Sequence, residues 1–290
     1  MSAGQRRIVS FGGSAVAIEY SGERAVASVA FLFQHVPAES DVAPHVTFCV
    51  ASDEQSEDLT LYRDETLVYA GDCQATWAEL LLGETCHHLA DRSRGGLLFH
   101  AAGLACRGRG VLLPGGIGAG KSTLSAWLAS KGLDYLTDEL VFVPQGSNRM
   151  QAFVRPLNLK NASLPVLQDC IDFEGRAAHV LSGPQATLVG PRAFQSSVAA
   201  DEQPLGLVVF PRYQPGADFA LRPLSKAQGG LELMQCLINA RNLPDYGLAE
   251  IARLAQAAPA FCMSYASFEQ VGERIEEMCY SQDSAAQERE

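Results

Sequence analysis

Short apolar runs alternate with polar residues over the first part of the chain, a pattern typical of strands with one buried face. Residues 25–33 are apolar enough for a helix, and residues 77–90 show apolar positions at helical spacing. The runs that predict strands cover residues 8–11, 15–20, 46–51, 59–62 and 66–70. Together these elements predict a small N-terminal α+β domain over residues 1–92.

After Gly95 and Gly96, apolar strands alternate with helices, which predicts an α/β fold. The expected strands cover 97–105, 111–114, 135–144 and 205–211, and the expected helices cover 123–129, 226–240 and 248–257. An apolar segment over 153–159 and a mixed region to about residue 203 lie between these groups. Ser225 is expected to cap the helix that follows it. We expect this second domain to cover residues 93–280, with a flexible polar tail over 281–290.

Residues 115–122 match the phosphate-binding pattern G-x-x-x-x-G-K-[ST] at every fixed position. The motif stands between an expected strand and an expected helix, which is the order it requires. Glycines can turn backbone N–H groups toward clustered phosphate charge, and the following helix points its positive end to the same place. A purely structural glycine-rich turn is the alternative. The residues expected to bind a nucleotide are Gly115, Gly116, Ile117, Gly118, Ala119, Gly120, Lys121, Ser122 and Thr123.

A carboxylate pair, Asp138 and Glu139, follows Lys121 by about seventeen residues, inside the expected strand 135–144. Burial of acids costs free energy unless a cation compensates, and a metal-bound nucleotide beside Lys121 would do so. With Ser122, which would ligate Mg²⁺ through its hydroxyl, this pair forms the candidate metal site. In the alternative, the segment is a surface turn in which Asp134 and Asp138 act as caps.

Four further charged residues are candidates for the same site. His100 ends the apolar run 97–99, from which it could lean toward the phosphate loop, although a lone histidine is more often structural. Arg155 and Lys160 could hold the γ-phosphate or an acidic group of a substrate, with a solvated edge strand as the alternative. Arg212 lies in a loop punctuated by prolines that could close on a substrate, with a plain turn as the alternative.

Charge and cysteine content restrict the partners and the compartment. A net charge of −11 disfavours broad attraction to nucleic acid or to an anionic membrane. The eight cysteines include no C-x-x-C pair, which fits reduced thiols better than a disulfide framework or a zinc site. No apolar run has the length of a signal-peptide core or of a membrane span. We therefore expect a soluble, cytoplasmic protein with no nucleic-acid or membrane partner.

Several segments together resemble the catalytic domain of the HPr kinase/phosphorylase family. They are Leu-Phe-His-Ala-Ala-Gly at 98–103, Val-Leu-Leu-Pro-Gly at 111–115, Gly-Ala-Gly-Lys-Ser-Thr at 118–123 and Leu-Thr-Asp-Glu at 136–139. Three more resemble the narrower group called HprK-related kinase A. These are Arg-Pro-Leu-Asn-Leu-Lys-Asn-Ala-Ser at 155–163, Val-Phe-Pro-Arg-Tyr at 209–213 and Pro-Leu-Ser-Lys-Ala at 223–227. The likeness covers about residues 96 to 270.

The resemblance implies a fold similar to that of phosphoenolpyruvate carboxykinase, with ATP and Mg²⁺ at the loop and transfer of phosphate to a serine hydroxyl. By position, Lys121 and Ser122 would bind phosphate and metal. Asp138 would be the base that takes the serine proton, and His100 would neighbour and tune it. Glu139 stands where the family usually has a second Asp.

One departure from the family concerns Val154, which replaces a metal-side Glu just before the Arg that Arg155 matches. Valine cannot ligate Mg²⁺, so the metal shell would be completed by Asp138, Glu139 or water. The phosphorolysis signature of that segment is also altered, so the reverse, phosphate-dependent activity is not expected.

The sequence therefore predicts an α/β P-loop kinase core of the HPr kinase/phosphoenolpyruvate carboxykinase-like type with a small N-terminal α+β domain. ATP and Mg²⁺ are the expected cofactors, and the serine of a small protein or peptide is the expected acceptor. The N-terminal domain is expected to recognise the substrate or a partner, and the chain to form a homo-oligomer. Two rivals stay open: a kinase for a small molecule such as a free amino acid, and a nucleotide-sensing module without catalysis.

Overall fold

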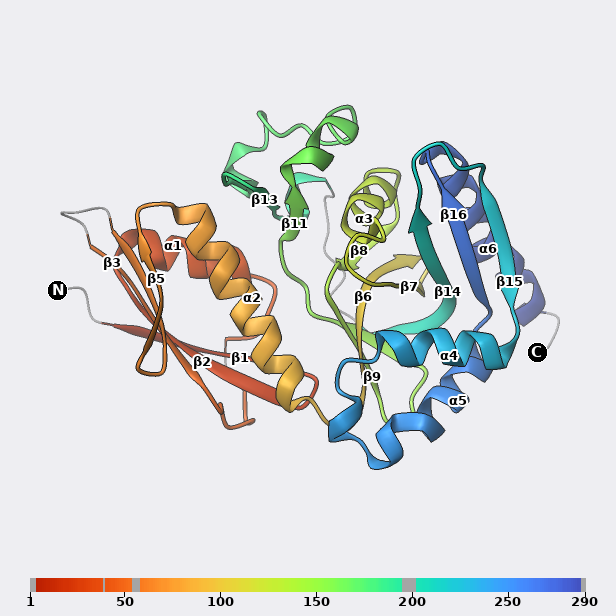
Figure 1. Cartoon of the computed structure of the whole chain (residues 1–290), viewed down its shortest axis with the longest axis horizontal. Helices are drawn as coiled ribbons and strands as arrows, with labels where there is room; N and C mark the ends of the chain where they lie inside the picture. Colours follow the sequence, from red (N-terminus) through yellow and green to blue (C-terminus); the bar gives the residue numbers. More distant parts are fainter. Residues whose placement is uncertain (1–3, 39, 54–57, 195–201, 288–290) are drawn as a thin grey trace. The chain divides into compact units, whose positions relative to one another are not determined.

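The structure, a computed structural model, describes residues 4–38, 40–53, 58–194 and 202–287 of the 290-residue chain. The chain forms two compact units (Figure 1). The first unit combines Met1–Arg94 with Val154–Ala193, and the second combines Gly95–Phe153 with Phe194–Glu290. Each unit is therefore built from two separate stretches of sequence.

The first unit contains a five-stranded sheet with the strand order β1-β2-β3-β4-β5. Its strands are β1 (Gln5–Phe11), β2 (Ser14–Ser21), β3 (Thr47–Ser52), β4 (Leu59–Arg63) and β5 (Thr66–Gly71). The helices α1 (Glu23–Phe33) and α2 (Gln74–Arg92) pack against this sheet. Their apolar sides bury Phe33 and Trp77 completely, together with Phe48 of β3. Each segment of residues 1–92 expected to form a strand or a helix forms one.

The remainder of the first unit is a three-stranded antiparallel sheet with the order β11-β13-β12. It consists of β11 (Leu157–Lys160), β12 (Val180–Ser182) and β13 (Ala186–Val189), with short 3₁₀ helices between them. Asn158 Nδ2 donates a hydrogen bond to Glu79 Oε1 of α2 at 2.8 Å. Residues 154–193, which were expected to belong to the second domain, are grouped with the first unit in the structure.

The second unit contains a mixed eight-stranded sheet with the order β10-β9-β6-β7-β14-β16-β15, and β8 also pairs with β6. The strands are β6 (Gly96–Cys106), β7 (Arg109–Pro114), β8 (Asp134–Thr137), β9 (Leu140–Pro144), β10 (Arg149–Ala152), β14 (Gln203–Tyr213), β15 (Ala220–Leu224) and β16 (Ala260–Tyr265). Both neighbours β7 and β16 run parallel to β14. The carboxyl ends of these three strands therefore meet at one edge of the sheet.

Four helices accompany this sheet: α3 (Lys121–Ser130), α4 (Lys226–Cys236), α5 (Leu248–Ala257) and α6 (Glu269–Gln287). A buried cluster joins Phe99, Leu112 and Val208 of the strands to Leu233 of α4 and Ile251 of α5. The predicted helix 248–257 is confirmed in full. The mixed α/β character expected of the chain is therefore confirmed.

Three sequence-based expectations about this unit differ from the structure. The single strand expected over 135–144 is two strands, because the chain bends between Thr137 and Leu140. Helix α4 ends at Cys236 rather than at residue 240, although its predicted cap is confirmed: Ser225 and Gln228 form a reciprocal capping box. The tail expected over 281–290 is helical as far as Gln287, and residues 288–290 lie outside the described residues.

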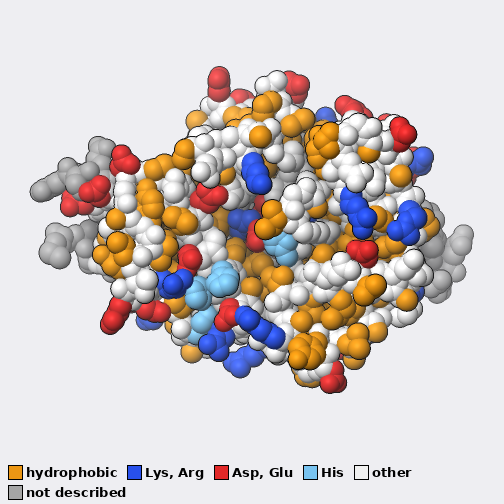
Figure 2. Space-filling view, viewed as in Figure 1, with side chains coloured by type: hydrophobic (Ala, Val, Ile, Leu, Met, Phe, Trp, Pro, Cys, Tyr) orange, Lys and Arg blue, Asp and Glu red, His pale blue; other side chains and the backbone are white. Residues whose placement is uncertain are grey.

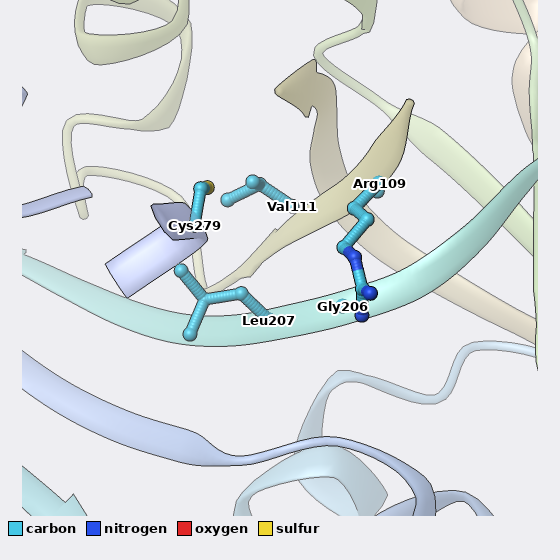
Figure 3. A pocket seen from close by; sticks show the side chains of 6 residues that line it. Arg109, Val111, Gly206, Leu207 and Cys279 are labelled. Carbon is cyan, nitrogen blue, oxygen red and sulfur yellow. The ribbon is translucent and has the colours of Figure 1, made fainter. Parts of the chain in front are cut away.

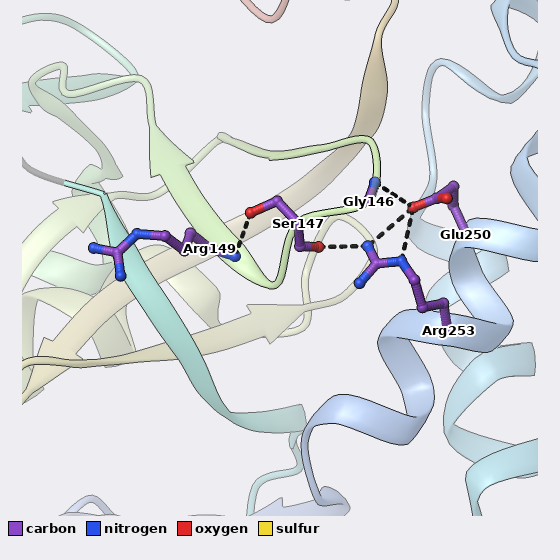
Figure 4. Close-up of polar contacts among 5 residues, drawn as sticks. All are labelled: Gly146, Ser147, Arg149, Glu250 and Arg253. Atoms are coloured by element: carbon purple, nitrogen blue, oxygen red, sulfur yellow. Dashed lines mark hydrogen bonds and ion pairs between the residues drawn. The ribbon is translucent and has the colours of Figure 1, made fainter.

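A polar network joins the β9–β10 turn to α5 (Figure 4). Gly146 N donates to Glu250 Oε2 at 3.0 Å, and Arg253 Nε donates to the same oxygen at 3.0 Å. Arg253 also donates to the carbonyl oxygen of Ser147. One carboxylate thus satisfies a turn N–H group and holds the guanidinium that reaches the turn.

On the face shown in Figure 2, acidic and basic side chains are intermixed, and apolar side chains gather over α4 and α5. Exposed large apolar residues of this region include Leu231, Ile238, Tyr246 and Leu248. Among the helices in the described ranges, none combines the length and the apolar character that a bilayer crossing requires.

Candidate functional site

The glycine-rich loop lies where the three parallel strands of the second unit end. Residues 115–120 connect the last residue of β7, Pro114, to the first residue of α3, Lys121. The adjacent strands β14 and β16 end at Tyr213 and Tyr265, which are paired in register. Ligands of open α/β sheets bind outside the carboxyl ends of parallel strands, so the loop stands at the expected edge.

The loop has a conformation that requires glycine. Gly118 and Gly120 both have φ of +87°, and Gly120 is the residue that precedes the first turn of α3. A Cβ atom at Gly120 would lie 2.6 Å from the Tyr265 hydroxyl oxygen. Ile117, at the tip of the loop, is 90% exposed. The backbone is thus open to solvent at its tip and closely packed where it enters the helix.

Lys121 is buried beside the loop. The residue is only 6% exposed. Its Nζ atom donates hydrogen bonds to the carbonyl oxygens of Gly115 at 2.7 Å and Gly116 at 3.2 Å. Burial lowers the pKa of Lys121, while the negative charges of Glu139 and Asp138 act in the opposite direction and raise it. The cation and both carboxylates therefore interact in one part of the second unit.

The acidic pair lies in the bend between β8 and β9. Thr137 Oγ1 donates to the carbonyl oxygen of Phe153 at 2.8 Å and accepts from Glu139 N at 3.3 Å, which fixes the bend. Asp138 is 2% exposed, and its Oδ1 accepts a hydrogen bond from the Tyr135 hydroxyl at 3.4 Å. This burial disagrees with the alternative of a surface turn, since the carboxylate of a cap in a surface turn would be solvated.

His100 joins the site from β6. Its Nδ1 atom lies 3.1 Å from Glu139 Oε1, with both side chains partly exposed. The strand pairing explains this closeness, because His100 is opposite Leu140 in the β6–β9 register and Ala101 N donates to Glu139 O at 3.1 Å. The carboxylate that His100 contacts is thus the one next in sequence to the predicted base.

The other predicted cations have different places in the fold. Arg212 is an exposed residue of β14, and its guanidinium lies 3.6 Å from Glu232 Oε1 of α4. Arg155 is buried and Lys160 is exposed, and both belong to the first unit. The structure therefore does not assemble Arg155 or Lys160 with the loop within one unit, and their role in binding stays a prediction.

Two aromatic residues beside the loop, Tyr213 and Tyr265, were not among the predicted site residues. Tyr213 N donates to the carbonyl oxygen of Ala119 at 3.4 Å, and the rings of Tyr213 and Tyr265 have centroids 5.6 Å apart. From the sequence, Tyr213 was expected only as part of the loop around Arg212 and of the segment Val-Phe-Pro-Arg-Tyr, and Tyr265 had no expected role. They lie at the loop because the strands β7, β14 and β16 are parallel neighbours in the sheet. No local pattern in the sequence predicts this strand order.

The oxygen atoms of Ser122, Asp138 and Glu139 are the kind that Mg²⁺ binds. Ser122 is the second residue of α3 and is partly exposed, as is the following Thr123. Within the described ranges, no group of three or more His, Cys, Asp and Glu side chains is arranged to hold a metal by itself. Mg²⁺ is usually held by one or two carboxylates together with substrate phosphates and water.

A separate small pocket lies at the other end of β7 (Figure 3). It is lined by Arg109, Gly110, Val111, Gly206, Leu207 and Cys279. Since β7 begins at Arg109 and the glycine-rich loop follows Pro114, this pocket is not part of the loop site.

Comparisons with known proteins add little to this description. No family model matches the chain, and no curated protein matches it either. Among solved structures, the chain is similar to the Hpr(Ser) kinase/phosphatase from Coxiella burnetii, with 13% sequence identity and a TM-score of 0.34. The match covers 66% of this chain and 98% of that chain. A likeness this low assigns neither an activity nor a substrate.

Proposed function

We propose that the protein is an ATP- and Mg²⁺-dependent kinase that transfers the γ-phosphoryl group to a hydroxyl. The observation that carries this proposal is the burial of Lys121, which is hydrogen-bonded to the carbonyls of a glycine-rich loop and feels the charges of Glu139 and Asp138. A buried cation is costly, and here its position at the start of a helix suits a polyphosphate. Transfer to a hydroxyl additionally needs an acid–base residue, which Asp138 supplies.

The loop and the first turn of α3 would hold the nucleotide. Backbone N–H groups of residues 115–120 and the positive end of α3 attract phosphate oxygens. Lys121 would exchange its two hydrogen bonds to loop carbonyls for bonds to the β- and γ-phosphates. Ser122 and Thr123 offer hydroxyls at the same helix start.

The two carboxylates would have different roles in the transfer. Asp138 would orient the acceptor hydroxyl and accept its proton as the phosphoryl group leaves ATP. Glu139, held by His100, would provide a metal-side oxygen together with Ser122. Mg²⁺, when bound, neutralises charge on the transferring phosphate.

The acceptor we propose is the serine of a small protein or peptide, and the compartment is the cytoplasm. The first unit would contribute to recognition of that acceptor, with Arg155 and Lys160 as candidate contacts to its acidic groups, and Arg212 as a further candidate in the second unit. A homo-oligomer is the proposed form of the protein. A free amino acid is the rival acceptor, since the chemistry at the hydroxyl would be the same.

Incubation with γ-labelled ATP and Mg²⁺ against cell extract, followed by mass spectrometry, tests the proposal. We expect one serine-bearing species to gain label with the wild-type protein and not with Lys121→Met. If a free amino acid gains the label instead, the acceptor is a small molecule and not a protein or peptide. ATP binding without transfer to any acceptor would refute the kinase and favour a nucleotide-sensing module.

The same variant tests whether Lys121 is kept for binding or for stability. Because burial lowers its pKa, the charged lysine is less favourable in the folded protein than in water. We therefore expect Lys121→Met to lose ATP binding while its melting temperature stays the same or rises. If Lys121→Met binds ATP with the affinity of the wild type, the assignment of residues 115–122 as the nucleotide-binding loop is refuted.

A further inference from the structure

We propose that the ring of Tyr213 is the platform on which the base of the bound nucleotide stacks. The inference rests on the proposed function, since it assumes that a nucleotide binds the glycine-rich loop. It adds what the loop motif does not contain, a site for the base. Tyr213 is placed next to the loop by its own backbone, because its N–H group donates to Ala119 O at 3.4 Å.

The position of Tyr213 relative to the loop is fixed on two sides. A Cβ atom at Gly120 would lie 3.1 Å from the Cβ atom of Tyr213, so the side chain leaves the backbone directly beside the helix start. Tyr213 is also the last residue of β14, next to the strand that leads into the loop. A ring there lies within reach of a nucleotide whose phosphates occupy the loop.

Tyr213 is exposed to solvent, and its ring packs against a buried aromatic neighbour. Tyr213 is 45% exposed, whereas its neighbour Tyr265 is 1% exposed. The two rings meet at 62° with centroids 5.6 Å apart, and the centroid of the Phe268 ring lies 5.9 Å from that of Tyr265. An exposed aromatic ring that packs against another aromatic ring is suited to stacking on a base.

The buried hydroxyl of Tyr265 is a second sign of a ligand at this place. It lies against Gly120, and within the described residues it has no hydrogen-bond partner. Buried polar groups without a partner are rare in folded proteins and call for an explanation. A polar group of a bound nucleotide beside the start of α3 would provide the missing partner.

The order of strands in the sheet indicates how a bound nucleotide would be oriented. Strand β7 lies between β6 and β14, and the strands that flank the acidic bend, β8 and β9, both pair with β6. Asp138 and Glu139 therefore stand on one side of the loop, and Tyr213 and Tyr265 on the other. If the γ-phosphate faces the carboxylates that act on it, the base end of the nucleotide points toward the tyrosines.

Calorimetric titration with two ligands tests this inference. The ligands are Mg·ATP and Mg·tripolyphosphate, which has the phosphates but no base. We expect Tyr213→Ala to weaken binding of ATP by about 10-fold or more, because stacking on a base is worth about that much. Binding of tripolyphosphate should stay unchanged, and Tyr213→Phe, which keeps the ring, should bind ATP like the wild type.

The outcomes separate this inference from the proposed function. Equal ATP affinity of Tyr213→Ala and wild type would overturn the stacking platform alone, and so would equal losses for both ligands. A wild-type protein that binds neither ligand would overturn the nucleotide site and the platform with it. Tyr213 is exposed, so we expect Tyr213→Ala to keep the wild-type circular dichroism spectrum and melting temperature.

Discussion

Nδ1 of His100 lies 3.1 Å from Oε1 of Glu139, whereas Asp138, the adjacent carboxylate, accepts a hydrogen bond from the hydroxyl of Tyr135. The two acids of the pair thus have different surroundings. Asp138 is buried, and Glu139 is partly exposed and paired with a histidine from another strand. This difference is the basis on which we propose different roles for the two acids, acceptance of a proton by Asp138 and metal binding by Glu139.

Removal of the His100 side chain should weaken the metal site rather than the phosphate loop. A partner that orients a metal-binding carboxylate typically affects metal affinity by about 10-fold or more. We expect His100→Leu to raise the Mg²⁺ concentration needed for half-maximal transfer by about 10-fold. His100→Asn, which keeps a donor near the position of Nδ1, should restore part of this loss. A Mg²⁺ titration that is identical for the wild type and His100→Leu would contradict the positioning role.

Loss of the proton acceptor should separate transfer from binding. Asp138→Asn keeps the size of the side chain but cannot accept the hydroxyl proton, so we expect transfer to fall by about 100-fold or more. The dissociation constant for ATP, measured by calorimetry, should change by less than about 3-fold, which is small beside the fall in transfer. The matched control is Asp134→Asn, an exposed carboxylate at the start of β8 that should transfer normally. Full turnover by Asp138→Asn would remove Asp138 from the mechanism.

A methyl group at Gly120 should damage both the loop and the fold around it. The backbone there has φ of +87°, and the added Cβ atom would lie 2.6 Å from the Tyr265 hydroxyl oxygen. We expect Gly120→Ala to lower stability by about 1–3 kcal/mol and to abolish binding of ATP. The melting temperature from calorimetry measures the first effect, and an ATP titration the second.

Two further variants separate the causes of this loss. Gly116→Ala adds its methyl group into open space, without another atom within 4 Å, so its melting temperature should match the wild type. Tyr265→Phe in the Gly120→Ala background removes the clashing oxygen and should recover part of the stability. The unfavourable φ remains, so recovery should be incomplete. No recovery at all would show that the contact with the Tyr265 oxygen does not cause the loss, which would then come from the backbone φ and from the contact with the Cβ atom of Tyr213.

The network around Glu250 predicts a dependence of stability on pH. The N–H group of Gly146 lowers the pKa of Glu250 most, and Arg253 lowers it further. A carboxylate whose folded pKa is lowered stabilises the fold above its unfolded pKa, near 4.3. That contribution is lost as the pH falls through the lower, folded pKa. At pH 7, Glu250→Gln should therefore cost about 1 kcal/mol and lower the melting temperature by about 2–4 °C.

Calorimetric melts of both proteins from neutral to acidic pH provide the measurement. The difference between wild type and Glu250→Gln should shrink as the wild-type carboxylate becomes protonated. Asp218→Asn, a change at an exposed carboxylate of the same unit, is the control and should have little effect at any pH. A difference that is the same at acidic and neutral pH would rule out the charge of Glu250 as its source.

Many helices and strands could be predicted from the sequence because they depend on patterns of neighbouring residues. Alternation of apolar and polar residues is sufficient to identify β1 and β2, and the glycine spacing identifies the loop before α3. The bend at Asp138 was not predictable from the apolar run around it. It depends on the hydroxyl of Thr137, which bonds to Phe153 and to the N–H group of Glu139.

Features that depend on distant parts of the chain were missed for a different reason. Short apolar runs such as Leu157–Lys160 predict a strand but not the sheet or the unit to which it belongs. Tyr213 and Tyr265 are separated by about fifty residues and meet at the loop only through parallel pairing. The charged residues of the candidate site could be proposed from the sequence because each stands in or near a recognisable motif.

The interleaved composition of the two units restricts how the protein can be divided in the laboratory. The backbone passes from one unit to the other after Arg94, Phe153 and Ala193. A truncation that begins at Gly95 would therefore leave β11, β12 and β13 without α2, and Asn158 without Glu79. Isolation of the second unit requires removal of residues 154–193 as well, with a short linker that rejoins Phe153 to Phe194.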